Sequence, residues 1–153
     1  MFTKFLTVFF VSMLPLAELR VAVPLAVGMK LPLVASYVIC IIGNMIPVPF
    51  IFFFARKVLE WGAEKPILEK PFTWILKKGE KGGEKLMAKV GRSTYVALFL
   101  FVGIPIPGTG AWTGTLAASI LDLDFKKSVL AALGGVLLAG VIMGVASTGV
   151  FSL

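Results

Sequence analysis

The sequence has no histidine and a single cysteine, Cys40, which stands alone within an apolar run. A lone thiol without histidines can form neither an internal disulfide bond nor a Cys/His metal site. We therefore expect no metal, no cofactor and a buried, unreactive Cys40. The sequence also lacks a Ser/His/Asp arrangement, a phosphate-binding Walker loop and paired catalytic carboxylates. These absences argue against an enzyme and against transport driven by ATP.

Charged residues are also scarce, making up 15% of the 153 residues, whereas hydrophobic residues make up 58%. This composition lies far outside the range of soluble globular domains and indicates a protein whose solvent is a lipid bilayer. Ten of the fifteen Lys and Arg residues, and five of the eight acidic residues, fall between Arg56 and Arg92, for a local net charge of +5. We attribute this charge to the cytoplasmic side of a membrane and its anionic lipid headgroups, and expect no nucleic acid.

The apolar runs follow the same order twice: a short run, a break, a short run and a long run. They cover residues 5–17, 21–29 and 32–54 in the first half, and residues 94–104, 111–121 and 128–151 in the second. Charged residues break the first half, and a Pro/Gly-rich segment breaks the second. Residues 1–17 have the charge and apolar core of a signal peptide. We expect them to be retained, because the apolar core does not end in Ala-x-Ala-like small residues and because Glu18 and Arg20 follow at once, with more apolar sequence behind them.

The lengths of these runs predict the fold. At about 1.5 Å of rise per residue, a long run reaches roughly 35 Å and can cross a bilayer, whereas a short run reaches only about 13 to 20 Å. Each short pair therefore suits a re-entrant helical hairpin. We predict one all-α integral membrane domain, residues 1–153, built as an inverted repeat of a re-entrant hairpin plus a transmembrane helix. Residues 1–56 form the first hairpin and span, residues 57–92 a cytoplasmic amphipathic connector, and residues 93–153 the second hairpin and span.

Charge predicts the orientation of this fold in the cell membrane. The connector, Lys126 and Lys127 would lie in the cytoplasm, with both termini outside. A rival topology has four full spans, in which residues 5–29 and 94–121 each cross the membrane. It keeps the connector in the cytoplasm but moves Lys126 and Lys127 outward, against the positive-inside rule. We favour the hairpins and keep four spans as the alternative.

The first break holds the two charges of most interest. Glu18 is the only carboxylate outside the connector and the turn at residues 122–124, and Arg20 is the only guanidinium within an apolar run. Ionisable residues inside a membrane are costly, so they usually face a cavity and have partners. We expect Pro15 and Pro24 to break the helices on either side of this tip. Glu18 would carry a proton while Arg20 binds an anionic substrate group; the alternative is a structural ion pair.

The second break is rich in proline and glycine. It contributes the hairpin breaks Pro105, Pro107 and Gly108, and the candidate site residues Thr109, Gly110, Trp112 and Thr113. The prolines stop the incoming helix, and the free amides of residues 110–113 would begin the next one, forming an anion or polar-group site without a charged side chain. The threonines add hydroxyl groups, and the tryptophan could stack on a substrate. Alternatively, the tryptophan anchors at the interface and the glycines only let helices approach closely.

A third candidate lies in the first long run, where Asn44 precedes Pro47 and Pro49. The prolines free backbone carbonyls, and Asn44 can bond to unsatisfied groups of a neighbouring tip. Such a discontinuous span suits ion coordination or gating, and the alternative is a kink that packs the hairpin. In the last run, the spacing Gly140-x-x-x-Gly144 favours helix packing, within one chain or across a dimer.

At these residues the chain resembles the small multidrug export protein family, nearly end to end. The motifs that carry the resemblance are Glu18-Leu19-Arg20 with Ala22-Val23-Pro24, Gly43-Asn44 with Pro47-x-Pro49, and Pro105-x-Pro107-Gly108-Thr109-Gly110-Ala111-Trp112-Thr113-Gly114. Val21 stands where the family motif has a glycine. The family is similar to the DedA/VTT membrane proteins, which have paired re-entrant hairpins and are linked to proton-coupled export or to translocation of polyprenyl phosphates and phospholipids. Those proteins use arginines near the second hairpin, whereas residues 104–114 contain none.

The resemblance and the two breaks together predict a secondary transporter, a proton-coupled antiporter that exports small amphipathic or anionic compounds. Two other classes stay open: a lipid or polyprenyl-phosphate translocase (flippase or scramblase), and a non-transporting membrane scaffold. The expected partners are the lipid bilayer, protons, a small-molecule or lipid substrate, and a second copy of the chain in a homodimer.

Overall fold

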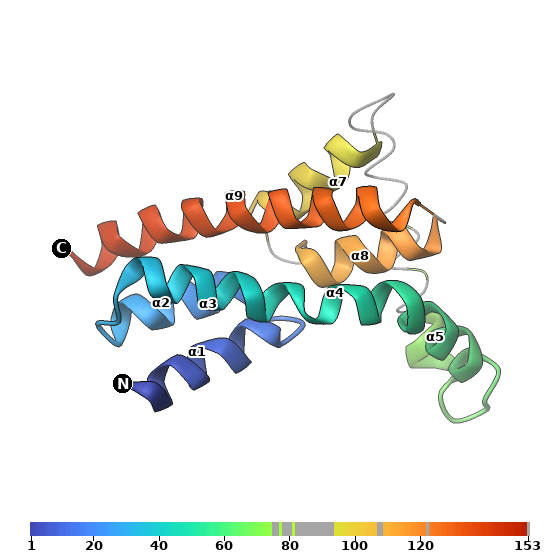
Figure 1. Ribbon diagram of the computed structural model, residues 1–153. Helices are drawn as coiled ribbons and strands as arrows, with labels where there is room; N and C mark the ends of the chain where they lie inside the picture. The colour runs from blue at the N-terminus through green and yellow to red at the C-terminus, as the bar shows by residue number, and fades with distance from the viewer. Residues whose placement is uncertain (75–76, 78–80, 82–93, 107–108, 122, 153) are drawn as a thin grey trace.

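The computed structural model describes residues 1–74, 77, 81, 94–106, 109–121 and 123–152, and the regular structure of this part of the chain is helical throughout (Figure 1). The all-α prediction is confirmed for these residues. Two of the predicted breaks, Pro107 and Gly108, lie outside the described residues, as do residues 75–76, 78–80 and 82–92 of the connector.

Within the described residues, two helical segments are long and apolar enough to cross a membrane: Leu33–Phe54, with 22 residues, and Phe125–Val150, with 26 residues. They confirm the two long apolar runs of the sequence. The first comprises α3 (Leu33–Met45), α4 (Pro47–Phe50) and most of the π-helix η1 (Ile51–Ala55), and the second belongs to α9 (Phe125–Phe151). The two segments run across the molecule in opposite directions, and α3 contacts α9 (Figure 1).

Four shorter helices form two pairs beside these long segments. They are α1 (Phe2–Met13), α2 (Glu18–Gly28), α7 (Thr94–Gly103) and α8 (Ala111–Ile120). With 10 to 12 residues each, they are about 15 to 18 Å long, which is roughly half the thickness of a bilayer core. The α1–α2 pair lies at the end of the molecule that holds both termini. The α7–α8 pair lies in the other half, nearer to α5 (Arg56–Ala63) (Figure 1).

The prolines of the two short pairs have different effects on the helices. Residues 14–17, which include Pro15, make the turn between α1 and α2, and Pro105 lies between α7 and α8. The prediction that Pro24 also breaks its hairpin is wrong, because α2 continues through Pro24 to Gly28. A proline inside a helix removes one amide donor, and the other backbone hydrogen bonds of α2 keep it helical.

Pro47 and Pro49 change the hydrogen bonding of the first long segment without turning the chain. α3 ends at Met45, Ile46 keeps helical dihedral angles (φ −58°, ψ −45°), and Pro47 begins α4. Because neither proline has an amide hydrogen, the carbonyls four residues earlier lose their usual donors. The π-helix η1 follows directly, and no pattern in the sequence predicts it.

The start of the predicted amphipathic connector forms the helix α5. Trp61 on this helix is exposed, and the Lys65 ammonium lies 5.1 Å from the centroid of its ring. Cys40, by contrast, is completely buried, as expected for an inert thiol.

The two glycines of the predicted small-residue motif on α9 have different surroundings. The Tyr37 hydroxyl donates a hydrogen bond to the Leu137 carbonyl at 2.6 Å, and a Cβ at Gly140 would overlap the Tyr37 ring. Apart from the neighbouring backbone of α9 itself, no described atom lies within 4 Å of the same position at Gly144. Close helix packing within the chain is therefore confirmed at Gly140, where α9 meets α3.

We expect Gly140→Ala to lower the unfolding midpoint of the detergent-solubilised protein, and Gly144→Ala to leave it unchanged or raise it. Overpacking a close contact costs about 1 to 3 kcal/mol, whereas alanine in an open helical position stabilises by roughly 0.5 to 1 kcal/mol. Both changes are measured by heating the protein to a series of temperatures and determining, by size-exclusion chromatography, the fraction that remains monodisperse. Equal midpoints for the two variants would contradict the tight contact with Tyr37.

Candidate functional site

The carboxylate of Glu18, in the first hairpin, lies at the N-terminal end of α8, in the second. Its Oε1 accepts a hydrogen bond from the Trp112 amide at 3.0 Å, and its Oε2 accepts one from the Ala111 amide at 3.3 Å. Glu18 is only 3% exposed, so these bonds join the two hairpin tips in the interior. The first amides of a helix lack partners within it and form the positive end of its dipole. A buried carboxylate is therefore well accommodated there.

Gly110 makes room for this carboxylate. It precedes α8 with φ 129° and ψ −176°, a conformation open essentially to glycine alone. A Cβ at this position would lie against both carboxylate oxygens of Glu18. Glycine is therefore required at position 110 both by the backbone and by the approach of Glu18.

The backbone of Glu18 is itself in an unusual conformation. Its φ is 49°, in the left-handed region that residues with side chains rarely adopt, at a cost of order 1 to 3 kcal/mol. Its amide donates to the Leu14 carbonyl at 2.9 Å and closes the turn between α1 and α2. Strain of this kind is typical of functional sites and persists where surrounding contacts hold it.

Arg20 bonds to the other helix end of the second hairpin. Its guanidinium donates four hydrogen bonds to backbone carbonyls: from Nη1 to Ile106 at 2.7 Å and Thr109 at 3.0 Å, and from Nη2 to Val102 and Ile104, both at 3.2 Å. The last carbonyls of a helix lack donors within it and form the negative end of its dipole. Arg20 thus neutralises the C-terminal end of α7 in the way that Glu18 neutralises the N-terminal end of α8.

The second hairpin contributes one side-chain bond in return. The Trp112 indole Nε1 donates to the carbonyl of Met13, the last residue of α1, at 3.1 Å. The Thr109 hydroxyl bonds within its own turn, to the carbonyls of Ile104 at 3.1 Å and Ile106 at 2.8 Å. We call the hydrogen bonds that Glu18, Arg20 and Trp112 make between the hairpins the tip interlock.

Residues 18–142 match the model of a protein family described as "Putative small multi-drug export protein". This segment is more than half of the chain and contains Glu18, Arg20 and the entire second hairpin. The chain belongs to this family. No curated protein and no solved structure matches it. The export family and the two long apolar helices together indicate a membrane protein.

Some candidate residues of this small multidrug export family member lie outside the tip interlock. Asn44 on α3 is 3% exposed, and its Oδ1 has no hydrogen-bond partner among the described residues. Thr113 follows Trp112 on α8 and is partly exposed. The structure therefore brings together only some of the predicted site residues, namely Glu18, Arg20, Thr109, Gly110 and Trp112.

The sequence predicts an anion or polar group at the α8 amides, but no local pattern identifies Glu18 as that anion. Two sequence signals could have found the contact: an isolated acid in an apolar hairpin, and a helix start that has no charged capping residue of its own. In the described part of this family member, no three Asp, Glu, Cys or His residues are grouped so that they could hold a metal ion. The buried charge of Glu18 and the half-buried charge of Arg20 are compensated by helix ends of the opposite hairpin and by their mutual attraction.

Proposed function

We propose that this member of the small multidrug export family is a proton-coupled exporter in the cell membrane, and that the tip interlock is its gate. The observation that carries the proposal is the position of Glu18, an isolated carboxylate in the apolar part of the chain, at the free amides of the opposite hairpin. Ionisable residues inside a membrane are typical of proton and substrate pathways.

Two re-entrant hairpins in an inverted repeat form the proposed framework of this gate. The α1–α2 pair, which packs side by side at the end with both termini, would enter from outside, and the α7–α8 pair would enter from the cytoplasm. Each helix of these pairs is too short to cross a bilayer alone, which supports the hairpins over four full spans. The positive connector, residues 57–92, would lie in the cytoplasm. We also propose a homodimer, because two spans alone can hardly shield two polar tips.

Protonation of Glu18 would open the gate by weakening its two bonds to α8. A hydrogen bond to a charged group contributes about 1.5 to 3 kcal/mol and one between neutral groups about 0.5 to 1.5 kcal/mol. The loss for two bonds is about 2 kcal/mol, which changes the ratio of closed to open tips by roughly thirtyfold. In the open state Arg20 would be released to an anionic group of the substrate, and deprotonation of Glu18 would close the tips again.

Labelling of single cysteines tests the orientation. In a Cys40→Ser background, we expect a cysteine replacing Lys127 to react with an impermeant thiol reagent only after the cells are opened. A cysteine replacing Phe2, which is 76% exposed near the N-terminus, should react in intact cells and serves as the matched control. Labelling at position 127 from outside intact cells would contradict the hairpin topology.

Transport in proteoliposomes tests the function. Vesicles with an acidic interior and an internal pH-sensitive dye are mixed with either anilinonaphthalene sulfonate, an amphipathic anion, or ethidium, an amphipathic cation. We expect uptake of a transported compound to make the interior less acidic. Both the uptake and the rise in internal pH should be absent in protein-free vesicles and after nigericin collapses the gradient. Uptake that is equal with and without the gradient contradicts proton coupling. Movement of fluorescent phospholipid between leaflets without any gradient would instead identify a lipid translocase.

A further inference from the structure

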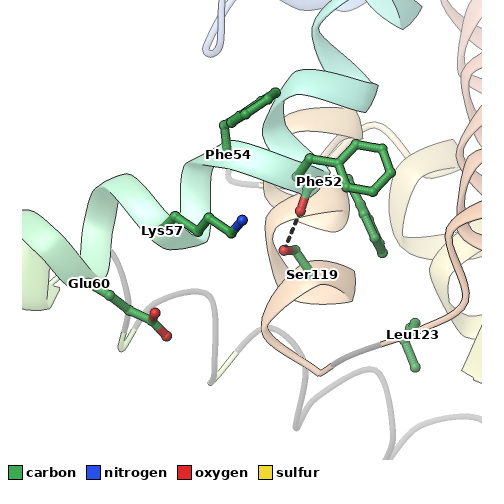
Figure 2. A pocket seen from close by; sticks show the side chains of 7 residues that line it. Phe52, Phe54, Lys57, Glu60, Ser119 and Leu123 are labelled. Atoms are coloured by element: carbon green, nitrogen blue, oxygen red, sulfur yellow. Dashed lines mark hydrogen bonds between the residues drawn. The ribbon is translucent and has the colours of Figure 1, made fainter.

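A cavity of about 600 Å³ lies where α8, η1 and α5 meet, at the end of the molecule opposite the termini (Figures 1 and 2). Its lining includes Phe52, Phe53 and Phe54 of η1, Lys57 of α5, Ser119 of α8 and Leu123. A volume of several hundred Å³ and a mostly apolar wall with few polar groups are typical of small-molecule sites. None of these residues belongs to the tip interlock.

The π-helix gives this cavity its aromatic wall. Successive side chains of a regular α-helix point about 100° apart, so three consecutive residues would spread over roughly 200° of the circumference. All three consecutive phenylalanines of η1 nevertheless line the cavity, and a wider π-helical turn makes this arrangement easier. The Ser119 hydroxyl holds η1 in place by donating to the Phe52 carbonyl at 2.6 Å (Figure 2). Isolated π-helical turns of this kind occur frequently at functional sites.

Lys57 gives the cavity a positive group. Figure 2 shows its ammonium group extending toward Ser119 and Phe52. Lys57 has no ionic partner within the described part of the chain, whereas Glu60, which also lines the cavity, has an interaction of its own. Phe53 and Phe54 are 49% and 56% exposed, so their rings are accessible to a ligand. Among the described residues, the cavity therefore combines exposed aromatic surface with the ammonium group of Lys57.

We propose that this cavity binds an amphipathic anion, with an apolar or aromatic body against the η1 phenylalanines and a single negative head at Lys57. Its role as the place where substrate is first bound, on the cytoplasmic side of the tip interlock, rests on the proposed export function. A free amphipathic acid and an anionic lipid share this chemistry, and the experiment distinguishes them.

Fluorescence titration of the protein in neutral phosphatidylcholine nanodiscs tests the site, with protein-free nanodiscs as the blank. We expect Lys57→Gln to weaken binding of anilinonaphthalene sulfonate about tenfold. Binding of N-phenyl-1-naphthylamine, which resembles that probe but has no sulfonate, should change less than twofold. Lys126→Gln removes another exposed cation, at the start of α9, and should change neither affinity. Phe54→Ala should weaken both probes, because it removes ring surface that both use.

Anionic phosphatidylglycerol in the nanodiscs identifies the source of the natural ligand. If it competes with the sulfonate in the wild type but not in Lys57→Gln, a lipid occupies the site. Lack of competition identifies a free amphipathic acid. Equal affinity of wild type and Lys57→Gln for the sulfonate, or equal weakening of both probes by Lys57→Gln, overturns the proposal. These titrations measure binding without a proton gradient or transport, so the site can stand even if the proton mechanism fails.

Discussion

Replacing Glu18 by glutamine should reduce transport driven by a proton gradient at least a hundredfold, while the protein still inserts and folds. Glutamine has nearly the shape of glutamate, and its side-chain oxygen can still accept a bond from one α8 amide, Ala111 or Trp112. It has no charge and no titratable proton, so the step that couples the tips to the gradient is lost. The initial rate of gradient-driven uptake in proteoliposomes, per folded protein, measures the effect.

The matched control for this variant is Glu64→Gln, which removes an exposed carboxylate from the segment after α5. Its rate should equal that of the wild type, because the residue lies far from the hairpin tips in the sequence and is open to solvent. Gradient-driven uptake retained in Glu18→Gln would remove Glu18 as the proton carrier. Uptake lost equally in both variants would show that the assay responds to overall charge.

Of the glycine-to-alanine substitutions considered, Gly110→Ala should cause the largest loss of stability. A residue with a side chain adopts φ 129° and ψ −176° only at a conformational cost of about 1 to 3 kcal/mol. The new Cβ would also meet the carboxylate oxygens of Glu18. We expect the thermal midpoint in detergent to fall by several degrees and the fraction of monodisperse protein to drop. Gly149→Ala is the control, since no described atom lies within 4 Å of the corresponding Cβ.

A double-mutant cycle separates the backbone contribution from the contact with Glu18. Removing the carboxylate in Glu18→Ala leaves only the backbone cost of alanine at position 110, so Gly110→Ala should then be less harmful than in the wild type. Contacting residues in such cycles typically show coupling of about 0.5 to 3 kcal/mol. Strictly additive effects on the midpoint would show that the side chain of Glu18 does not occupy the space beside Gly110.

The sequence was sufficient to predict the helical elements and the two breaks. Run length and hydropathy located the long helices. The charge pair at positions 18 and 20, and the glycine at position 110, stood out because each is rare or costly within an apolar run. All of these features can be read from short stretches of sequence, without knowledge of contacts between distant residues.

The remaining features depend on contacts between distant segments. Glu18 and Trp112 are 94 residues apart, and no local pattern specifies that the acid of one hairpin caps a helix of the other. The effect of a proline was also hard to predict, since Pro15 lies in a turn whereas Pro24 lies inside α2. The π-helix and its cavity result from the way η1, α5 and α8 meet, which periodicity does not show.

The distance between the two hairpin tips, measured as a function of pH, tests the central claim most directly. Spin labels on cysteines replacing Leu16 and Ile106, both exposed, in a Cys40→Ser background report this distance by pulsed electron paramagnetic resonance. Labelled protein diluted with unlabelled protein avoids signals between copies. We expect one short distance at high pH, a longer population at low pH, and the longer population at every pH in Glu18→Gln. A distance distribution that is the same at all pH values, and the same in the wild type and Glu18→Gln, would contradict a gate closed by the ionised Glu18.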